Sequence, residues 1–142
     1  MDYSMTITLD LPYDQAVVAV RQALAGQGFG ILTEIDARAT MKEKLGVDME
    51  PYIILGACNP PLAHRALEVD RLIGLLLPCN VVVRADGDQK SIVSALDPQV
   101  MVTIPEREDL RPVADEAGQR IRAALETLTA GDTTDLGRSD QR

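Results

Sequence analysis

Apolar and polar residues alternate along the first segment of the chain and then recur at helical spacing in the next. Residues 3–9 alternate, which is typical of a strand with one buried face. Pro12 precedes apolar residues spaced three or four positions apart, which predicts a helix that ends at Gly26 and Gly28. Residues 29–35 then predict a second strand. The chain therefore begins with a strand, a helix and a strand.

Boundary residues mark the elements in the middle of the chain. Asp36 and Gly46 are residue types that favour the start and the end of a helix, and they enclose a short helix over 37–45. The hydrophobic run 52–58 predicts a buried strand. Asn59-Pro60 follows it directly, and an N-cap residue with proline in the first helical position predicts another helix.

A hairpin in the second half decides the predicted fold class. Asp86-Gly87 lies between the strand-forming runs 81–83 and 92–96, which is a hairpin signal that joins antiparallel strands. Residues 100–104 fit either a strand or a short helical turn. Because the hairpin requires antiparallel pairing, we expect an α+β fold with two layers, in which one mixed or antiparallel sheet carries helices mainly on one face.

The C-terminal part of the chain predicts one long helix and a tail. Apolar residues at helical spacing indicate an amphipathic helix over 105–129. The segment 130–142 lacks any packing pattern, so we expect a disordered acidic tail. At 142 residues the chain has the length of a single domain, and residues 1–129 form that domain in this interpretation.

Composition and charge exclude several classes of partner. The net charge is −8 with no basic run, which argues against binding to nucleic acid or to anionic lipid. No apolar stretch approaches the ~20 residues of a membrane span, and no secretory signal precedes the first strand. We therefore expect a cytoplasmic protein without membrane or nucleic-acid partners, whose two cysteines are reduced.

The segment from Phe29 to about Asp88 resembles the bacterial and archaeal family known as domain of unknown function 302. The resemblance is carried by a set of short pieces in register, namely Glu34-Ile35-Asp36, Lys44-Leu45-Gly46, Leu55-Gly56-Ala57-Cys58-Asn59-Pro60, Ala66-Leu67 and Leu76-Leu77-Pro78-Cys79. It implies a bacterial domain with a compact two-layer α+β fold that pairs as a homodimer. The family has no established activity, so no catalytic residue is implied.

Both cysteines and the only histidine lie close together in the sequence, at Cys58, His64 and Cys79. Cys58 directly precedes a predicted helix start, where unpaired amides and the helix dipole favour a thiolate. The alternative is that Cys58 is a packing residue, since cysteine is often buried as a small hydrophobe. Cys79 alternates with Val81 and Val83, which predicts a core position. His64 lies over one turn inside the helix, a rise of roughly 7 Å, and an exposed position is the simpler expectation.

Metal and carboxylate sites are weakly indicated. Two cysteines and one histidine match the ligand types of an open zinc site, but no CxxC or HxxxH element is present, so we predict no metal site. Glu34 and Asp36 alternate on one strand face and have the spacing of a carboxylate dyad. We favour instead a helix cap for Asp36 and a solvent-facing Glu34. No phosphate-binding loop, nucleophile elbow or dinucleotide fingerprint is found, and the sequence leaves the cofactor unknown.

Three hypotheses remain open from the sequence. The first is a homodimeric, non-enzymatic or regulatory protein that binds a small molecule in a pocket around Cys58, Asn59, His64 and Cys79. The second is a thiol-based redox or thiol-transfer enzyme with Cys58 as nucleophile, Cys79 as resolving residue and His64 as base. The third is an interaction domain in which both cysteines are structural. The sequence leaves open whether the protein is an enzyme.

Overall fold

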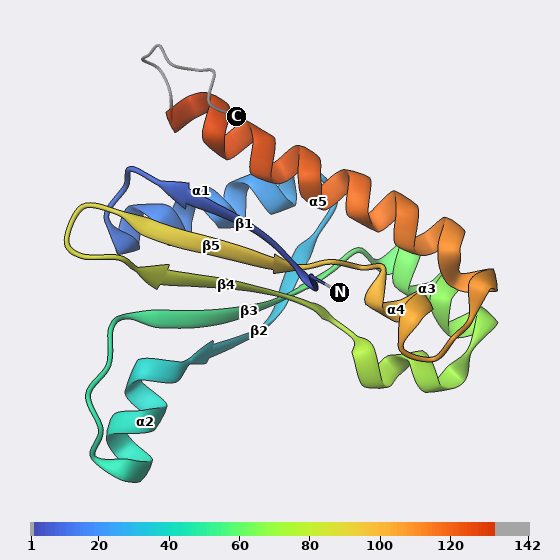
Figure 1. Cartoon of the computed structure of the whole chain (residues 1–142), viewed down its shortest axis with the longest axis horizontal. Coiled ribbons are helices and arrows are strands. Elements are labelled where there is room, and N and C mark those ends of the chain that lie inside the picture. Colours follow the sequence, from blue (N-terminus) through green and yellow to red (C-terminus); the bar gives the residue numbers. More distant parts are fainter. Residues whose placement is uncertain (1, 133–142) are drawn as a thin grey trace.

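The computed structural model describes residues 2–132, and within that range five strands form one antiparallel sheet (Figure 1). The strand order across the sheet is β1-β5-β4-β3-β2. The strands are β1 (Ser4–Leu9), β2 (Gly30–Asp36), β3 (Tyr52–Cys58), β4 (Cys79–Ala85) and β5 (Ser91–Leu96). The predicted α+β class and the predicted hairpin, which joins β4 to β5, are both confirmed.

Helices cover one face of the sheet and one of its ends. The α-helices are α1 (Tyr13–Ala25), α2 (Ala37–Leu45), α3 (Pro60–Val69), α4 (Val100–Thr103) and α5 (Arg111–Asp132), and the 3-10 helices are η1 (Arg71–Leu76) and η2 (Glu108–Leu110). Figure 1 shows α1 and α5 on the same side of the sheet, where they contact each other, while α3 and α4 lie together at one end. Helix α2 projects from the β2 edge and contacts β2 and β3.

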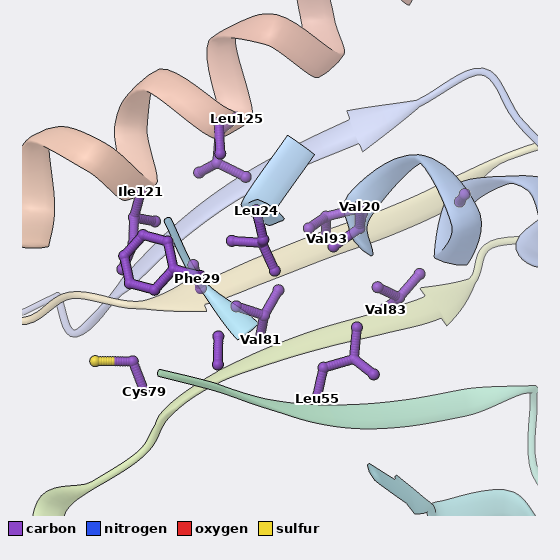
Figure 2. Packing of buried hydrophobic residues seen from close by; sticks show 14 of the residues in the cluster. Val20, Leu24, Phe29, Leu55, Cys79, Val81, Val83, Val93, Ile121 and Leu125 are labelled. Atoms are coloured by element: carbon purple, nitrogen blue, oxygen red, sulfur yellow. The ribbon is translucent and has the colours of Figure 1, made fainter. Parts of the chain in front are cut away.

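Two groups of buried side chains hold these layers together. We call the group between the sheet and helices α1 and α5 the sheet core, and Figure 2 shows it at close range. We call the group among α3, η1, α4, η2 and the first half of α5 the helical core; its larger members are Leu62, Ile73, Met101, Val102, Leu110 and Val113. Each fully buried Leu, Ile or Val stabilises the fold by roughly 1.5–3 kcal/mol relative to exposure.

Strand alternation selects which side chains enter the sheet core. Cys79, Val81 and Val83 of β4 are buried on one face, as predicted, whereas Asn80 between them is exposed. The same period of two places Leu55 and Ala57 of β3 in the core. Burial of Cys79 therefore follows directly from its position on the strand.

The predicted helix boundaries in the middle of the chain are confirmed by their capping contacts. The Asp36 carboxylate accepts a hydrogen bond from the Ala39 backbone N–H at 2.9 Å, and Gly46 ends α2 in the left-handed conformation, at a φ of 69°. The Asn59 side-chain oxygen accepts the Leu62 N–H at 3.2 Å and starts α3. These local signals were sufficient because each cap is satisfied within a few residues of its own position.

The predicted start of the long helix is wrong. Helix α5 begins at Arg111, and Pro105 lies in a turn before it. Glu106 adopts a left-handed φ of 57°, which interrupts any continuous helix, and the Arg107 N–H then bonds back to the Val102 carbonyl at 3.0 Å.

Two further predictions concern residues 100–104 and the segment from 130 onward. The segment left ambiguous at 100–104 forms the short helix α4. Helix α5 continues to Asp132, past the predicted end at 129, so the first residues of the expected tail are helical. The rest of that tail, 133–142, lies outside the described residues.

Candidate functional site

The two cysteines lie at the facing ends of neighbouring strands. Strand β3 ends at Cys58 and β4 begins at Cys79, and the antiparallel register pairs Ala57 with Cys79. Cys58 directly follows Ala57 in the chain, so it lies one residue beyond the position paired with Cys79. The two thiols are close enough that a charge on Cys58 affects the ionisation of Cys79.

Both cysteines line one small cavity at the junction of the sheet core and the helical core. The other lining residues come from both cores and from α3: Phe29, Ala57, Asn59, Leu62, Ala63, Ala66, Leu77, Pro78, Met101, Val113 and Ala117. The centre of a water molecule has about 20 Å³ in which to move inside it. That space suits one water molecule or a single ion, and it is far below the 300–1,000 Å³ that is typical of an organic-ligand pocket.

Burial keeps both thiols protonated. Cys79 is buried, and this burial, with a smaller effect from the charge of Cys58, raises its pKa to about 11. Figure 2 shows the Cys79 side chain at the margin of the sheet core. Cys58 is half-buried, and burial raises its pKa as well. Since the thiolate is the reactive form, neither cysteine is activated as a nucleophile at neutral pH.

The expectation that the start of α3 would lower the pKa of Cys58 is therefore not met, and the first turn of α3 gives the reason. Its first two residues are Pro60 and Pro61, which carry no backbone N–H. The third amide, that of Leu62, is already bonded to the Asn59 side chain. The amides that would stabilise a thiolate by hydrogen bonding are thus missing or occupied, and the desolvation of Cys58 prevails.

Asn59 is the polar side chain that borders the cavity. It is only 9% exposed, and its oxygen caps α3. Its amide nitrogen lies against Gly28: a Cβ atom built on Gly28 would be 2.9 Å from that nitrogen, and Gly28 has a φ of 86°. Both facts require glycine at this position. Asn59 consequently fixes the end of β3 relative to the segment that leads into β2.

His64 does not face the cavity. Its side chain is 72% exposed, and its Nε2 lies 3.7 Å from the carboxylate of Glu68, one turn further along α3. The lining residues of α3 are Leu62, Ala63 and Ala66, which occupy another face of the helix. The structure therefore brings together Cys58, Asn59 and Cys79 of the predicted site and leaves His64 on the solvent side. In this position it cannot act as a base for Cys58.

One residue of the site was not foreseen from the sequence. Met101 is 3% exposed, lies on the short helix α4 and places a third sulfur-containing side chain in the cavity wall. It is 22 positions after Cys79 in a segment with ambiguous patterning. No local signal links it to the cysteines, because α4 reaches the cavity only through the packing of the helical core.

The remaining polar candidates are accounted for by ordinary contacts. Glu34 forms an ion pair with Arg21 of α1 at 2.6 Å, and Asp36 caps α2, so they are not a catalytic dyad. Across residues 2–132, no group of three or more His, Cys, Asp and Glu side chains has the arrangement of a metal site. No helix within the same described range is long and apolar enough to cross a membrane.

Comparison with known proteins supports the fold and gives no activity. The model of the family described as "Domain of unknown function DUF302" matches residues 5–128. The crystal structure of an uncharacterized conserved protein DUF302 from Bacillus stearothermophilus is similar, with a TM-score of 0.82 and 26% sequence identity. That similarity covers 90% of this chain and 99% of the other. No curated protein matches the chain.

Proposed function

Because this chain belongs to the DUF302 family, whose description assigns no activity, we propose a function from its cavity: the protein is non-enzymatic and binds a small ligand between Cys58 and Cys79. The observation that carries the proposal is that two thiols from neighbouring strands, both kept neutral by burial, line the same cavity. Thiols with raised pKa values are poorly suited to nucleophilic attack, because the thiolate is the reactive form. They can still hold a ligand, and a metal ion would have to displace their protons.

A thiol-based enzyme fits this arrangement less well. Catalysis by Cys58 requires a lowered pKa or an adjacent base. Burial raises the pKa of Cys58, and His64 lies on the exposed side of α3 with Glu68 as its partner. The missing amides at Pro60 and Pro61 remove the other source of thiolate stabilisation. Binding is therefore the activity that the contacts support.

The size of the cavity limits the ligand. About 20 Å³ of free space accommodates a ligand the size of a water molecule or a single ion, and a metabolite fits only if α3 moves away from the strand ends. The lining is almost entirely apolar apart from the thiols and Asn59. A ligand at this site must consequently be very small and must gain its affinity from sulfur contacts.

Thermal denaturation of the full chain with a panel of small inorganic ions and small neutral molecules tests this proposal. A ligand that binds only the folded state raises the midpoint in proportion to the logarithm of its concentration. We expect at least one compound to stabilise the wild-type protein and the His64→Asn control, and to have no effect on Cys58→Ser. If every compound leaves the midpoint unchanged, or if Cys58→Ser responds like the wild type, the cavity is not a binding site.

We also propose that the protein is a homodimer that pairs through the β2 edge and α2. Five large apolar side chains are exposed on this part of the surface: Leu32, Ile35, Met41, Leu45 and Val47. An edge strand offers unpaired backbone groups, and exposed apolar side chains near it favour association, most often as a two-fold dimer.

Light scattering on the full chain at micromolar concentration tests the pairing, with Leu45→Glu as the disrupting variant. The matched control is Leu75→Glu, since Leu75 is also an exposed leucine, at 83% against 68% for Leu45, but lies on η1 far from α2 in the sequence. We expect dimer mass for the wild type and the control, and monomer mass for Leu45→Glu. A monomer mass for the wild type would contradict the proposal that the protein is a dimer. A dimer mass for Leu45→Glu would contradict the proposal that the dimer forms through the β2 edge and α2.

A further inference from the structure

Three sulfur-containing side chains converge on the cavity. Of the two cysteines and five methionines of the chain, both cysteines and one methionine, Met101, line it. They come from three separate elements, since Cys58 ends β3, Cys79 begins β4 and Met101 lies on α4. No carboxylate and no imidazole is among the lining residues. The donor atoms at this site are therefore mainly sulfur, with the Asn59 amide as the one other polar side chain.

This donor set selects one class of metal ion. Thiolate and thioether sulfur are soft ligands that favour Cu(I), whereas carboxylate and carbonyl oxygens suit Mg²⁺ and Ca²⁺. Structural zinc sites are almost always tetrahedral with four Cys or His ligands, and this cavity offers two thiols with His64 turned away. Within residues 2–132 no group of three or more His, Cys, Asp and Glu side chains is arranged to hold a metal ion, so a site in this cavity depends on the Met101 thioether as its third ligand.

The free space agrees with a single ion. About 20 Å³ excludes an organic ligand unless the cavity opens, and a bare metal ion needs less room than a water molecule. Cys58 is half-buried and thus partly accessible to solvent, while Met101 and Cys79 form the buried side of the site.

We propose that this cavity is a Cu(I) site in which the sulfur atoms of Cys58 and Cys79 bind the ion and the thioether of Met101 supplies a third, weaker contact. The inference rests on the proposed ligand-binding function and specifies its ligand. On binding, Cu(I) replaces the two thiol protons, which pass to the buffer, while Met101 loses none. No electron is transferred, and the loaded site carries one net negative charge beside the exposed edge of Cys58.

Competition for Cu(I) on the reduced full chain tests the inference, with the coloured complex of Cu(I) and bicinchoninate as the probe under anaerobic conditions. The wild-type protein is expected to remove one Cu(I) per chain from the chelator and to be indifferent to Zn²⁺ under the same conditions. Cys58→Ser and Cys79→Ser are each expected to weaken binding by at least about 100-fold, since each removes a direct ligand.

The methionine contact has its own matched pair of variants. Met101→Leu keeps the volume and removes the thioether, and we expect it to weaken Cu(I) binding by about tenfold. Met49→Leu is the control, because Met49 lies in the connection between α2 and β3, is partly exposed and does not line the cavity. It should bind Cu(I) like the wild type.

Two measurements on the wild type alone keep the test valid if a cysteine variant fails to fold. Bound Cu(I) should protect both cysteines from alkylation, and X-ray absorption at the copper edge should report only sulfur neighbours. The inference is overturned if the wild type does not take Cu(I) from the chelator, or if Cys58→Ser binds Cu(I) as tightly as the wild type. It is also overturned if X-ray absorption shows nitrogen or oxygen atoms bound directly to the copper.

The same variants separate the inference from the function on which it rests. If the wild type does not bind Cu(I) but another small ligand stabilises the wild type and not Cys58→Ser, then the Cu(I) assignment is wrong and the proposed binding site is retained. If neither Cu(I) nor any ligand has an effect, both the assignment and the proposed function are wrong.

Discussion

Alkylation of Cys79 should be far slower than that of an ordinary thiol and should rise steeply with pH. Burial, with a smaller contribution from Cys58, raises the pKa of Cys79 from its ordinary value of 9.0 to about 11. Iodoacetamide reacts with the thiolate, so the rate follows the thiolate fraction. At pH 8 that fraction is about 9% for a pKa of 9.0 and about 0.1% for a pKa of 11, which predicts a rate about 100-fold lower.

The rate should increase about tenfold for each pH unit up to about pH 10, because the thiolate fraction grows by that factor below the pKa. Cys58 provides an internal comparison in the same molecule. Burial raises its pKa too, but it is half-buried, so it should react more slowly than a free thiol and faster than Cys79.

Site-resolved mass spectrometry after timed alkylation measures both rates at once. The control is the chain unfolded in urea, where both cysteines should react at the same rate as a model thiol. A Cys79 that titrates near or below 8.5 in the folded protein would refute the conclusion that burial keeps it neutral. A Cys58 with a lowered pKa would restore the thiol-enzyme hypothesis in place of the binding function.

Two further predictions concern stability. Folding raises the pKa of Cys79, so the stabilising contribution of the neutral thiol is complete below about pH 9 and is lost as the pH rises through 11. Urea titrations should show that the free energy of unfolding of the wild type falls by up to about 3 kcal/mol more than that of Cys79→Ala over this range. Equal decreases in the two proteins would contradict the raised pKa. Gly56→Ala should destabilise the fold by about 1–3 kcal/mol, since its Cβ would meet the Thr33 hydroxyl and lie 2.8 Å from the Pro78 ring. Gly74→Ala has no such contact and should change stability by less than about 0.5 kcal/mol in the same titration.

Much of the fold could be predicted because its signals are local. Asp36, Asn59 and Gly46 act on backbone groups within a few residues, and all three bound the helices as expected. The alternation that buries Cys79 is equally local. The start of α5 was misplaced because the amphipathic pattern extends back across the turn, where the left-handed Glu106 and the extended Arg107 interrupt it.

The site was only partly predictable because it is assembled by tertiary packing. The pocket hypothesis grouped Cys58, Asn59 and Cys79, but the sequence left open whether the two cysteines lie on neighbouring strands; the pairing of β3 with β4 brings them together. The exposed position of His64 agrees with the simpler expectation for this residue, whereas the pocket and thiol-enzyme hypotheses both included it, because the face of a helix that packs depends on its neighbours. Met101 could not be linked to the cysteines at all, since the helical core alone brings α4 to the cavity.

Anomalous X-ray scattering from crystals grown with Cu(I) tests the central claim most directly, because it locates the ion without reference to any variant. We predict a single strong peak at the copper edge inside the cavity, between the sulfur atoms of Cys58 and Cys79 and on the side of Met101. An empty cavity, with copper bound only at surface groups such as His64, would contradict the claim that the two thiols form a ligand site.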